Sequence, residues 1–401
     1  MMCPTNELAS LSDFVEIKHG FAFDSAFFGE SGDYLLLTPG NFNECGGFRD
    51  LGPAQKHYSG PIPPRFVLRK GDVLVAMTEQ SPGLLGSTIR IPADDTYLHN
   101  QRLGLISIRR PECINLGYLY HLFNAPHVRK EISSNSSGTK VKHTSPTKLC
   151  SVVVYIATLD EQERVAALLD EWDSAIEKSE KLIAAKEQHY THELSRLISR
   201  GHHPRGHVGS FAHEVSERNR GGNAARVLSV TNSRGFVLPE DQFERRVASA
   251  DLSNYKVVRR GQYAYNPSRI NVGSIARLDD WDDGVLSPMY VVFGVDESKI
   301  NSDYFLHWLD SHEACERIKK SAQGSVRETV SFTEFAGLAI PLPGVAKQAA
   351  IARYLNALRE EIAILGNYLE TLKAQKRGLM QKLLTGQWRV KLPESKEKSH
   401  G

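Results

Sequence analysis

The sequence predicts an α+β fold that occurs twice in tandem. Each copy is a globular domain of mixed α and β structure, with a curled and mostly antiparallel sheet, followed by one long helix. Three observations predict this fold. The chain of 401 residues repeats itself at a nearly constant spacing, its globular parts alternate β-branched and aromatic runs with turn residues, and two long segments carry the apolar spacing of a coiled coil. The two copies imply a pseudo-twofold internal repeat.

The repeat rests on residues that recur in the same order. Val154 and the residues up to Gln162 align with Ile340 and the residues up to Gln348, a shift of 340 − 154 = 186 residues. The same shift pairs Val165 with Ile351, Leu169 with Leu355, Ile176 with Ile362, Tyr118 with Tyr304, and His121 with His307. A repeat of about 186 residues has the size of one domain.

The globular part of each copy, at about residues 11–155 and 207–343, is rich in Gly, Pro, Asn and Asp between short apolar runs. Predicted strands include Tyr34–Thr38, Asp72–Ala76 and Tyr290–Phe293. Near the end of each part, an amphipathic helix is expected at about 116–132 and 304–322, followed by a polar loop that contains glycine. Such a mixture predicts an α+β domain.

The long helices are predicted at 160–199 and 346–384, because apolar residues there recur in alternating steps of four and three. In the second helix this seam includes Leu355, Leu358, Ile362, Leu365, Leu369, Leu372, Leu379 and Leu383. In the first helix it includes Leu169, Trp172, Ile176, Ile183 and Leu197, with more polar positions between them. Gly201 and Gly386 follow the helices, where a C-terminal glycine belongs.

Each helix would be about 60 Å long, at about 1.5 Å per residue, and neither would be stable alone in water. We expect the two helices to pack on each other as an antiparallel coiled coil. A helix of this kind also serves simply as a packing or dimerisation device. The expected division is a first globular domain at 1–157, a first helix at 158–201, a second domain at 202–343, a second helix at 344–390, and a charged tail at 391–401.

The composition is that of a globular protein, with 41% hydrophobic and 24% charged residues. The net charge of +2 means that a nucleic-acid partner would be met by local patches. The five cysteines are far apart in the sequence, so neither a zinc site nor a disulfide framework is expected, and a reducing cytoplasm fits. The sequence shows no signal peptide and no apolar run long enough for a membrane span.

No constellation of residues predicts catalysis, a cofactor or a metal. Asn266-Pro267 is similar to part of an amino-methyltransferase loop, but Ser268-Arg269 follows and no Gly-rich cofactor loop precedes it, so a turn is favoured. His202, His203 and His207 lack helical spacing and nearby Cys or acidic partners, and they are interpreted as linker residues rather than metal ligands.

Four segments resemble the specificity subunit of type I restriction-modification systems, in which target recognition domains alternate with conserved helices. The segments are Ile340–Gln348, Leu372–Val390, Tyr265–Ser274 and Phe14–Gly20. The first is similar to the proline-bearing start of the family's conserved helix, and the second to its C-terminal end. The resemblance covers residues 8–390. The first helix departs from it, because its start at Leu159–Glu163 lacks the prolines.

The resemblance implies a non-catalytic, cytoplasmic subunit without a cofactor. Each target recognition domain would grip one half of a bipartite site in double-stranded DNA, and the helices would set the gap. A length of about 60 Å exceeds one DNA turn of about 34 Å, so half-sites a turn or more apart are natural. The family's helices also dock two adenine-N6 methyltransferase subunits, which the restriction endonuclease and translocase subunits join.

DNA contacts require donors on loops, namely Arg and Lys for phosphates and guanine edges, and Asn and Gln for adenine. Matching loops of the two copies offer them. The candidates are Asn41, Asn43, Gln80, Ser81, Thr139 and Lys140 in the first copy, and Asn232, Arg234, Asn266, Ser268, Arg269, Asn271, Gln323, Ser325 and Arg327 in the second. A single one of these residues is more often an ordinary solvated loop residue, whereas their recurrence at equivalent loops favours DNA binding.

Two other classes of protein stay open at this point. A stand-alone DNA methyltransferase or nuclease with duplicated recognition domains would require a cofactor loop or a carboxylate cluster. A purely structural coiled-coil adaptor would not need the Arg and Asn donors on the loops.

Overall fold

The computed structural model describes residues 3, 6–79, 83–138, 141–222, 226–232, 234–239, 251–323 and 329–390. The chain separates into two compact units, and each long helix contributes one half to each of them. The first unit comprises residues 1–179 and 368–401, and the second comprises residues 180–367. No helix among the described residues is long and apolar enough to cross a membrane.

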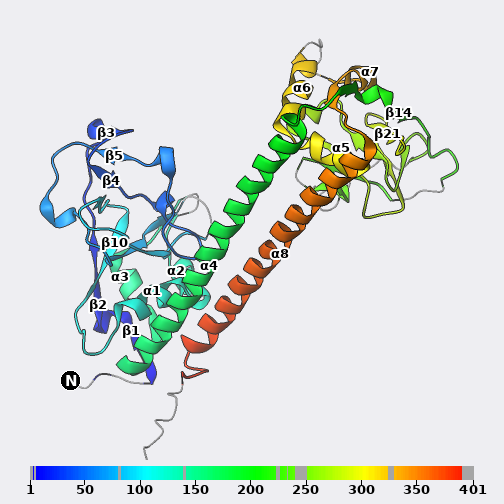
Figure 1. Cartoon of the computed structure of the whole chain (residues 1–401). Coiled ribbons are helices and arrows are strands. Elements are labelled where there is room, and N and C mark those ends of the chain that lie inside the picture. Colours follow the sequence, from blue (N-terminus) through cyan, green and yellow to red (C-terminus); the bar gives the residue numbers. More distant parts are fainter. Residues whose placement is uncertain are drawn as a thin grey trace, which may run out of the picture. The chain divides into compact units, whose positions relative to one another are not determined.

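The first unit is built around a four-stranded antiparallel sheet with the order β2-β10-β6-β8 (Figure 1). A second sheet, β3-β5-β4-β9, is antiparallel apart from its last pair. The strands are β1 Glu7–Ser10, β2 Val15–His19, β3 Phe28–Gly29, β4 Tyr34–Leu36, β5 His57–Tyr58, β6 Val73–Ala76, β7 Thr78–Glu79, β8 Thr88–Arg90, β9 Tyr97–Leu98, β10 Leu103–Ile108, β11 Lys142–His143 and β12 Val153–Ile156. The short helices are α1 Leu116–Asn124, α2 Pro126–Ser134 and α3 Pro146–Cys150.

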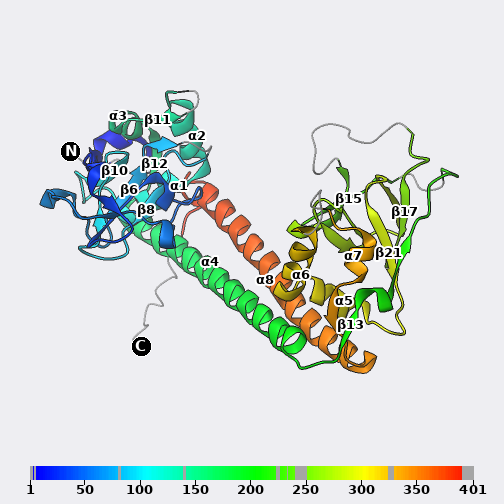
Figure 2. The same ribbon diagram turned by 90° about the horizontal axis from the view of Figure 1, so that it is seen from above.

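The second unit repeats this plan with the sheet β14-β21-β18-β19, which is antiparallel throughout. Its strand β21 is labelled in Figure 2. Its strands are β13 Arg205–His207, β14 Ala212–Val215, β15 Ser229–Thr231, β16 Gly235–Val237, β17 Lys256–Arg259, β18 Tyr263–Tyr265, β19 Ile275–Arg277, β20 Asp283–Leu286, β21 Val291–Val295 and β22 Ala339–Pro341. Its short helices are α5 Ser302–Leu309, α6 His312–Gln323 and α7 Phe332–Ala336. The α+β fold with mostly antiparallel sheets is therefore confirmed.

The long helices are α4, Leu159–Leu194, and α8, Val345–Leu383. A π-helical turn, Ser195–Ser199, extends α4, so both helices match the predicted spans within two residues. Gly386 has a φ of +72° and ends α8 in the left-handed conformation, as expected. After α4 it is His202, with a φ of +48°, and not Gly201, that is left-handed.

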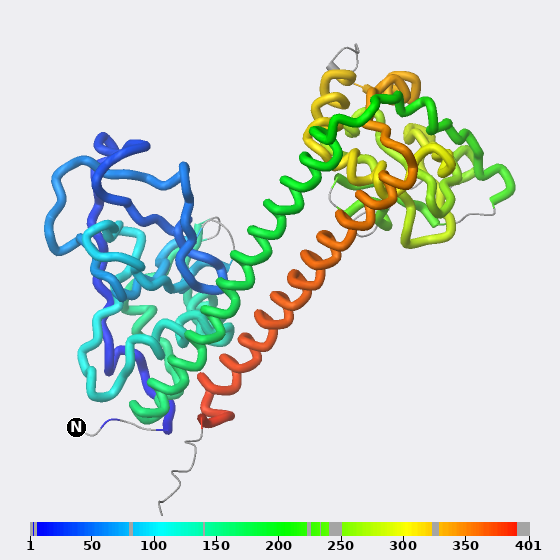
Figure 3. Tube along the Cα trace, viewed as in Figure 1, coloured from blue at the N-terminus to red at the C-terminus, as the bar shows by residue number. Residues whose placement is uncertain are grey.

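Within each unit, one half of α4 and one half of α8 run antiparallel and pack against the globular part (Figure 3). The core of the first unit contains Val165 and Leu169 from α4 together with Met380 and Leu383 from α8. The core of the second contains Leu194 and Ile198 from the end of α4 together with Ile351 and Leu355 from the start of α8. All predicted seam residues are buried or half-buried. Each unit therefore takes part of its core from the other sequence repeat.

Equivalent polar residues join the globular part to its helix in both units. Gln162 Nε2 donates to the carbonyls of Cys113 and Ala157, at 2.9 Å each, and its Oε1 accepts from the Asn115 amide at 2.9 Å. In the second unit, Gln348 makes the same three bonds, to the carbonyls of Lys299 (3.2 Å) and Pro343 (2.7 Å) and from the amide of Asn301 (2.7 Å). All four pairs of positions differ by the predicted shift of 186 residues, which supports the duplication at the level of single hydrogen bonds.

One predicted helix near the end of each globular part is in fact two. In the first unit the break falls at Ala125, which is extended, because Pro126 follows and disfavours helical backbone before it. In the second unit Asp310 ends α5, and the Ser311 hydroxyl accepts from the Ala314 amide at 3.2 Å and so caps α6.

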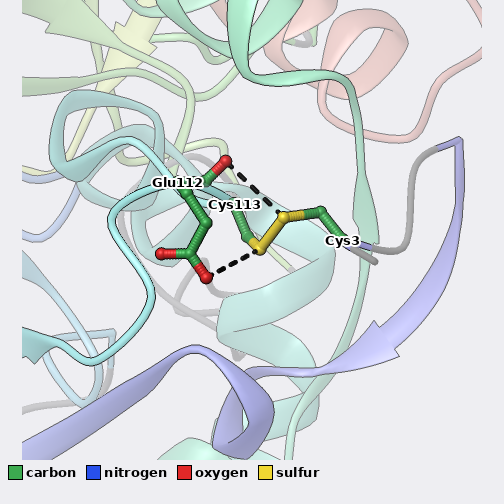
Figure 4. A group of neighbouring side chains, drawn as sticks. All are labelled: Cys3, Glu112 and Cys113. Atoms are coloured by element: carbon green, nitrogen blue, oxygen red, sulfur yellow. Dashed lines mark hydrogen bonds between the residues drawn. A yellow bond between two sulfur atoms is a disulfide. The ribbon is translucent and has the colours of Figure 1, made fainter. Parts of the chain in front are cut away.

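The expectation that the cysteines form no disulfide is wrong for one pair. Cys3 is bonded to Cys113 across a sequence separation of 110 residues, beside Glu112 (Figure 4). Sequence spacing missed this pair because the contact is made by the fold, which brings Cys3 to the loop before α1. Cys45, Cys150 and Cys315 are free.

Candidate nucleic-acid interface

The fold of the first unit brings together three segments that hold predicted DNA contacts. The described parts of these segments, residues 38–47, 78–79 with 83–87, and 136–138 with 141–143, are called loop cluster 1. The Ser87 hydroxyl donates to the Asn43 carbonyl at 2.6 Å, which joins the first segment to the second. The third segment is joined to the second by the pairing of β11 with β7, in which Lys142 lies opposite Glu79. The three loops therefore form one structural feature.

Two charged side chains, Glu79 and Arg129, form hydrogen bonds with the backbone of the second segment. Glu79 is buried, and one of its carboxylate oxygens accepts from the amides of Leu84 (2.8 Å) and Leu85 (2.7 Å). Arg129 of α2 donates to the carbonyls of Leu85 (2.7 Å), Glu44 (3.1 Å) and Gly83. Burial lowers the pKa of Arg129 to about 10, so it stays a cation at neutral pH.

The predicted contacts of the first copy fall in different places. Asn43 is exposed. Asn41, by contrast, is fully buried, and its amide nitrogen donates to the Gln55 side chain at 2.6 Å while its oxygen accepts from the Thr38 amide at 2.9 Å. Its assignment as a DNA contact is therefore corrected, because both ends of its amide are used inside the fold. Gln80, Ser81, Thr139 and Lys140 lie outside the described residues.

The second unit brings together residues 230–232 with 234–235 and the loop 266–274, which match the first two segments, and the segment 329–331, which follows the third predicted loop; these are called loop cluster 2. The Ser274 hydroxyl donates to the Val230 carbonyl at 2.8 Å, and the Val330 amide donates to the Pro267 carbonyl at 3.1 Å. Gly273 has a φ of +93° and passes close to Asn232, a position that strongly favours glycine. Each of the three segments is thus bonded or packed to the middle one.

The middle loop of cluster 2 holds most of the described candidates. The Asn266 side chain accepts from the Ser268 amide at 3.0 Å, so the predicted turn after β18 is confirmed. Ser268 and Arg269 are exposed and Asn271 is half-buried. Among the described residues, no ion pair neutralises Arg269. Asn232 and Arg234 are exposed in the first loop of the cluster. Gln323 is the last residue of α6, and its side chain is not among the described ones. Ser325 and Arg327 lie outside the described residues.

The other polar groups contribute to the structure. His203 and His207 bond to the carbonyls of Leu197 (2.8 Å) and Gly337 (2.9 Å), in keeping with linker residues. Among the described residues, His121, Asp170 and Asp173 are close enough to hold a cation. Their two carboxylates, however, already pair with Arg90 (2.7 Å) and Lys376. The site offers hydrogen-bond donors on loops, which is the chemistry of recognition.

No pattern in the sequence identifies Arg129 and Glu79 as supports of the loops. Glu79 adjoins Gln80, and Arg129 lies on a helix of ordinary amphipathic pattern. Their partners are backbone carbonyls and amides of other segments, and these leave no mark on residue type.

The comparisons with known proteins agree on one family. Residues 5–187 match the type I restriction modification DNA specificity domain. The EcoBI specificity subunit of Escherichia coli is 25% identical over 96% of this chain and 87% of its own length. The putative MjaX specificity subunit of Methanocaldococcus jannaschii is 21% identical over 82% of this chain and 80% of that protein.

Solved structures show the same fold. The S subunit of the type I restriction-modification system from M. genitalium superposes with a TM-score of 0.60, at 14% identity, over 94% of this chain and 96% of its own. A chain from a structure on complex assembly and conformational transition of the type I R-M system gives 0.56, at 14% identity, over 97% and 100%. With the repeat, the paired helices and the two loop clusters, these likenesses agree: the chain is similar to the specificity subunits of type I restriction-modification systems.

Proposed function

We propose that this chain is the non-catalytic subunit that gives a type I restriction-modification complex its DNA sequence specificity. Each loop cluster would read one half of a bipartite site in double-stranded DNA. The observation that carries the proposal is the recurrence of bonded loops beside equivalent four-stranded sheets, joined by Ser87 in the first unit and by Ser274 in the second. Exposed Asn and Arg side chains on such loops can donate to base edges and to phosphates.

The two long helices would set the gap between the half-sites. In support of this role, α4 continues as one helix from the first unit into the second over 36 residues, or about 54 Å at about 1.5 Å per residue. The helices would also dock two adenine-N6 methyltransferase subunits, through which the restriction subunits would join. Exposed apolar side chains on α8, such as Tyr354, Ile364 and Tyr368, offer contact area for such partners. A DNA-bound complex of this kind would work in the cytoplasm.

The test is to produce the full chain with an adenine methyltransferase partner and to sequence the methylated DNA. The pair should methylate one bipartite sequence, whereas the chain alone should transfer no methyl group. Inserting residues into the segment 160–199 should change the tolerated gap and leave both half-sites unaltered. Methyl transfer by the isolated chain, or a changed half-site after the insertion, would contradict the proposal.

Single residues can be tested in the same assay. Arg269→Ala should cost about 1–3 kcal/mol of discrimination at one position of the half-site that the second unit reads, because a guanidinium in a loop can bind a guanine edge with two donors. Uniformly weaker methylation of all sequences would instead identify Arg269 as a phosphate contact.

A further inference from the structure

Arg129 of the first unit has an unusual set of partners. Its guanidinium donates from Nε to the Leu85 carbonyl at 2.7 Å and from Nη1 to the Glu44 carbonyl at 3.1 Å, and Nη2 donates to the Gly83 carbonyl. All three nitrogens thus bind main-chain oxygens, in two loops that are about 40 residues apart in the sequence. Among the described ion pairs, none involves Arg129. Its role is therefore to join loops and not to neutralise a carboxylate.

The carbonyls that Arg129 binds flank the predicted DNA contacts. Glu44 follows Asn43 directly, and Gly83 follows the segment 80–82 that holds Gln80 and Ser81. At the other end of that segment, buried Glu79 accepts from the amides of Leu84 and Leu85. Both backbone polar groups of Leu85 are therefore bonded to side chains: its amide donates to Glu79, and its carbonyl accepts from Arg129.

No other type of side chain offers the same arrangement of hydrogen-bond donors as the Arg129 guanidinium. A lysine would keep the charge but would present its donors from a single nitrogen, and a glutamine would present one NH₂ group. The left-handed glycines support the close fit, because a Cβ on Gly86 (φ +80°) would lie 2.8 Å from Ile132 and 3.4 Å from the Arg129 side chain. The positions of the three loop carbonyls therefore match the donor positions of the Arg129 guanidinium.

We propose that Arg129 is a positioning residue that holds two loops of loop cluster 1 in the arrangement that reads the first unit's half-site. At the equivalent position of the second unit, the shift of 186 residues places Cys315, which has one weak S–H donor in place of the guanidinium. The loops of the second unit are held instead by Ser274 and Val330. The inference rests on the proposed function and predicts that the two half-sites depend on different residues.

The first experiment needs no DNA. Hydrogen exchange of the full chain is compared for the wild type, Arg129→Lys and Arg129→Gln, with Arg102→Gln as control, because Arg102 is exposed in the same unit. Both Arg129 variants should raise the exchange rate of amides in 44–47 and 83–87 by about tenfold or more, with no change in the second unit. Unchanged exchange in Arg129→Lys would overturn the inference, since a cation alone would then be enough.

The second experiment measures specificity in the complete complex with the methyltransferase partner. Methylation rates are compared on DNA with a correct site and on DNA with one wrong base pair in either half-site. Both Arg129 variants should lose about tenfold of discrimination at the first unit's half-site and none at the other. Ser274→Ala should do the reverse, and Arg102→Gln should alter neither ratio.

The outcomes separate the two proposals. If the wild-type complex methylates no bipartite sequence, the proposed function fails. If it does so and Arg129→Lys keeps the wild-type discrimination at both half-sites, only the role of Arg129 fails. Equal loss at both half-sites with a lowered Tm would mean that Arg129 simply stabilises the fold, and would overturn the positioning role.

Discussion

Lys376 of α8 donates a charge-assisted hydrogen bond to Asp173 of α4, although 203 residues separate them in the sequence. The pair has no copy in the second unit. There the repeat places Arg359 and Tyr190 at the matching positions, and the guanidinium lies 5.1 Å from the centre of the tyrosine ring. In an antiparallel pair of two α8 helices, Arg359 of one copy would therefore lie opposite Lys376 of the other copy. Charge thus favours the pairing of α4 with α8 over the pairing of either helix with itself.

The first prediction concerns this ion pair. Lys376→Glu should destabilise the first unit by about 1–3 kcal/mol, because Lys376 is mostly buried and two carboxylates would then face each other. Thermal unfolding of the full chain measures the loss. The double variant Asp173→Lys, Lys376→Asp should recover most of it. If the double variant is no more stable than Lys376→Glu, the pair does not contribute through its charges.

The second prediction concerns the two equivalent glutamines. Gln348→Ala should cost about 2–4 kcal/mol, because it leaves the Asn301 amide and the carbonyls of Lys299 and Pro343 without their partner in a buried place. Gln162→Ala should cost a similar amount in the first unit. Chemical denaturation with a probe in each unit checks this. A loss for one glutamine alone would show that the repeats are not equivalent in stability.

The third prediction is a pH dependence. His99 is buried, and its Nε2 lies 2.9 Å from the Leu103 carbonyl. Burial, against the smaller effects of that carbonyl and of Asp72, lowers the pKa of His99 from about 6.5 to about 4. The unfolded chain therefore binds the proton first as the pH falls. The stability that His99 contributes is complete above pH 6.5 and is lost between pH 6.5 and 4, by up to about 3 kcal/mol.

His99→Gln keeps an N–H donor and cannot titrate, so its free energy of unfolding should fall less steeply over this range. His121 and His307 also have pKa values lowered by burial and will leave part of the slope in the variant. Denaturant titrations at several pH values decide the matter. Parallel curves for the wild type and the variant would contradict the assignment.

The fourth prediction concerns the disulfide. With the Cys3–Cys113 bond formed, unfolding of the first unit should require a higher temperature than in the presence of a reductant, because the bond restricts the unfolded chain. Cys3→Ser should match the reduced protein under both conditions. Peptide mapping without reductant identifies the pair. A Tm that does not respond to reductant in the wild type would argue against a stabilising bond.

The features that follow from local patterns were predictable. Steps of three and four residues fix a long helix because each turn must present an apolar side chain to the same partner, and α8 begins within one residue of the prediction. The repeat gave the topology of the second unit once the first was understood. The turn at Asn266-Pro267 followed from the chemistry of its two residues.

The features that depend on distant segments were not predictable in this way. Asn41 has the composition of a loop donor, and only the fold shows that Gln55 and Thr38 occupy its amide. Arg129 is one of many basic residues in the sequence, and only the fold shows that α2 positions it to bind the carbonyls of two loops. The Cys3–Cys113 pair likewise depends on where the fold places Cys3. In each case the partner is set by tertiary packing, which overrides the tendency of the residue itself.

Tyr155 of β12 joins the two ends of the described chain. Its hydroxyl donates to the Asn6 side chain at 2.9 Å and accepts from the Arg389 guanidinium at 3.3 Å, while Gly386 packs on its ring. A short peptide linking these ends would close the backbone into a ring, in which neither repeat comes first. Reopening that ring at residues 200–204 would give a circularly permuted chain that should keep both cores, so the order of the two repeats along the chain would be interchangeable.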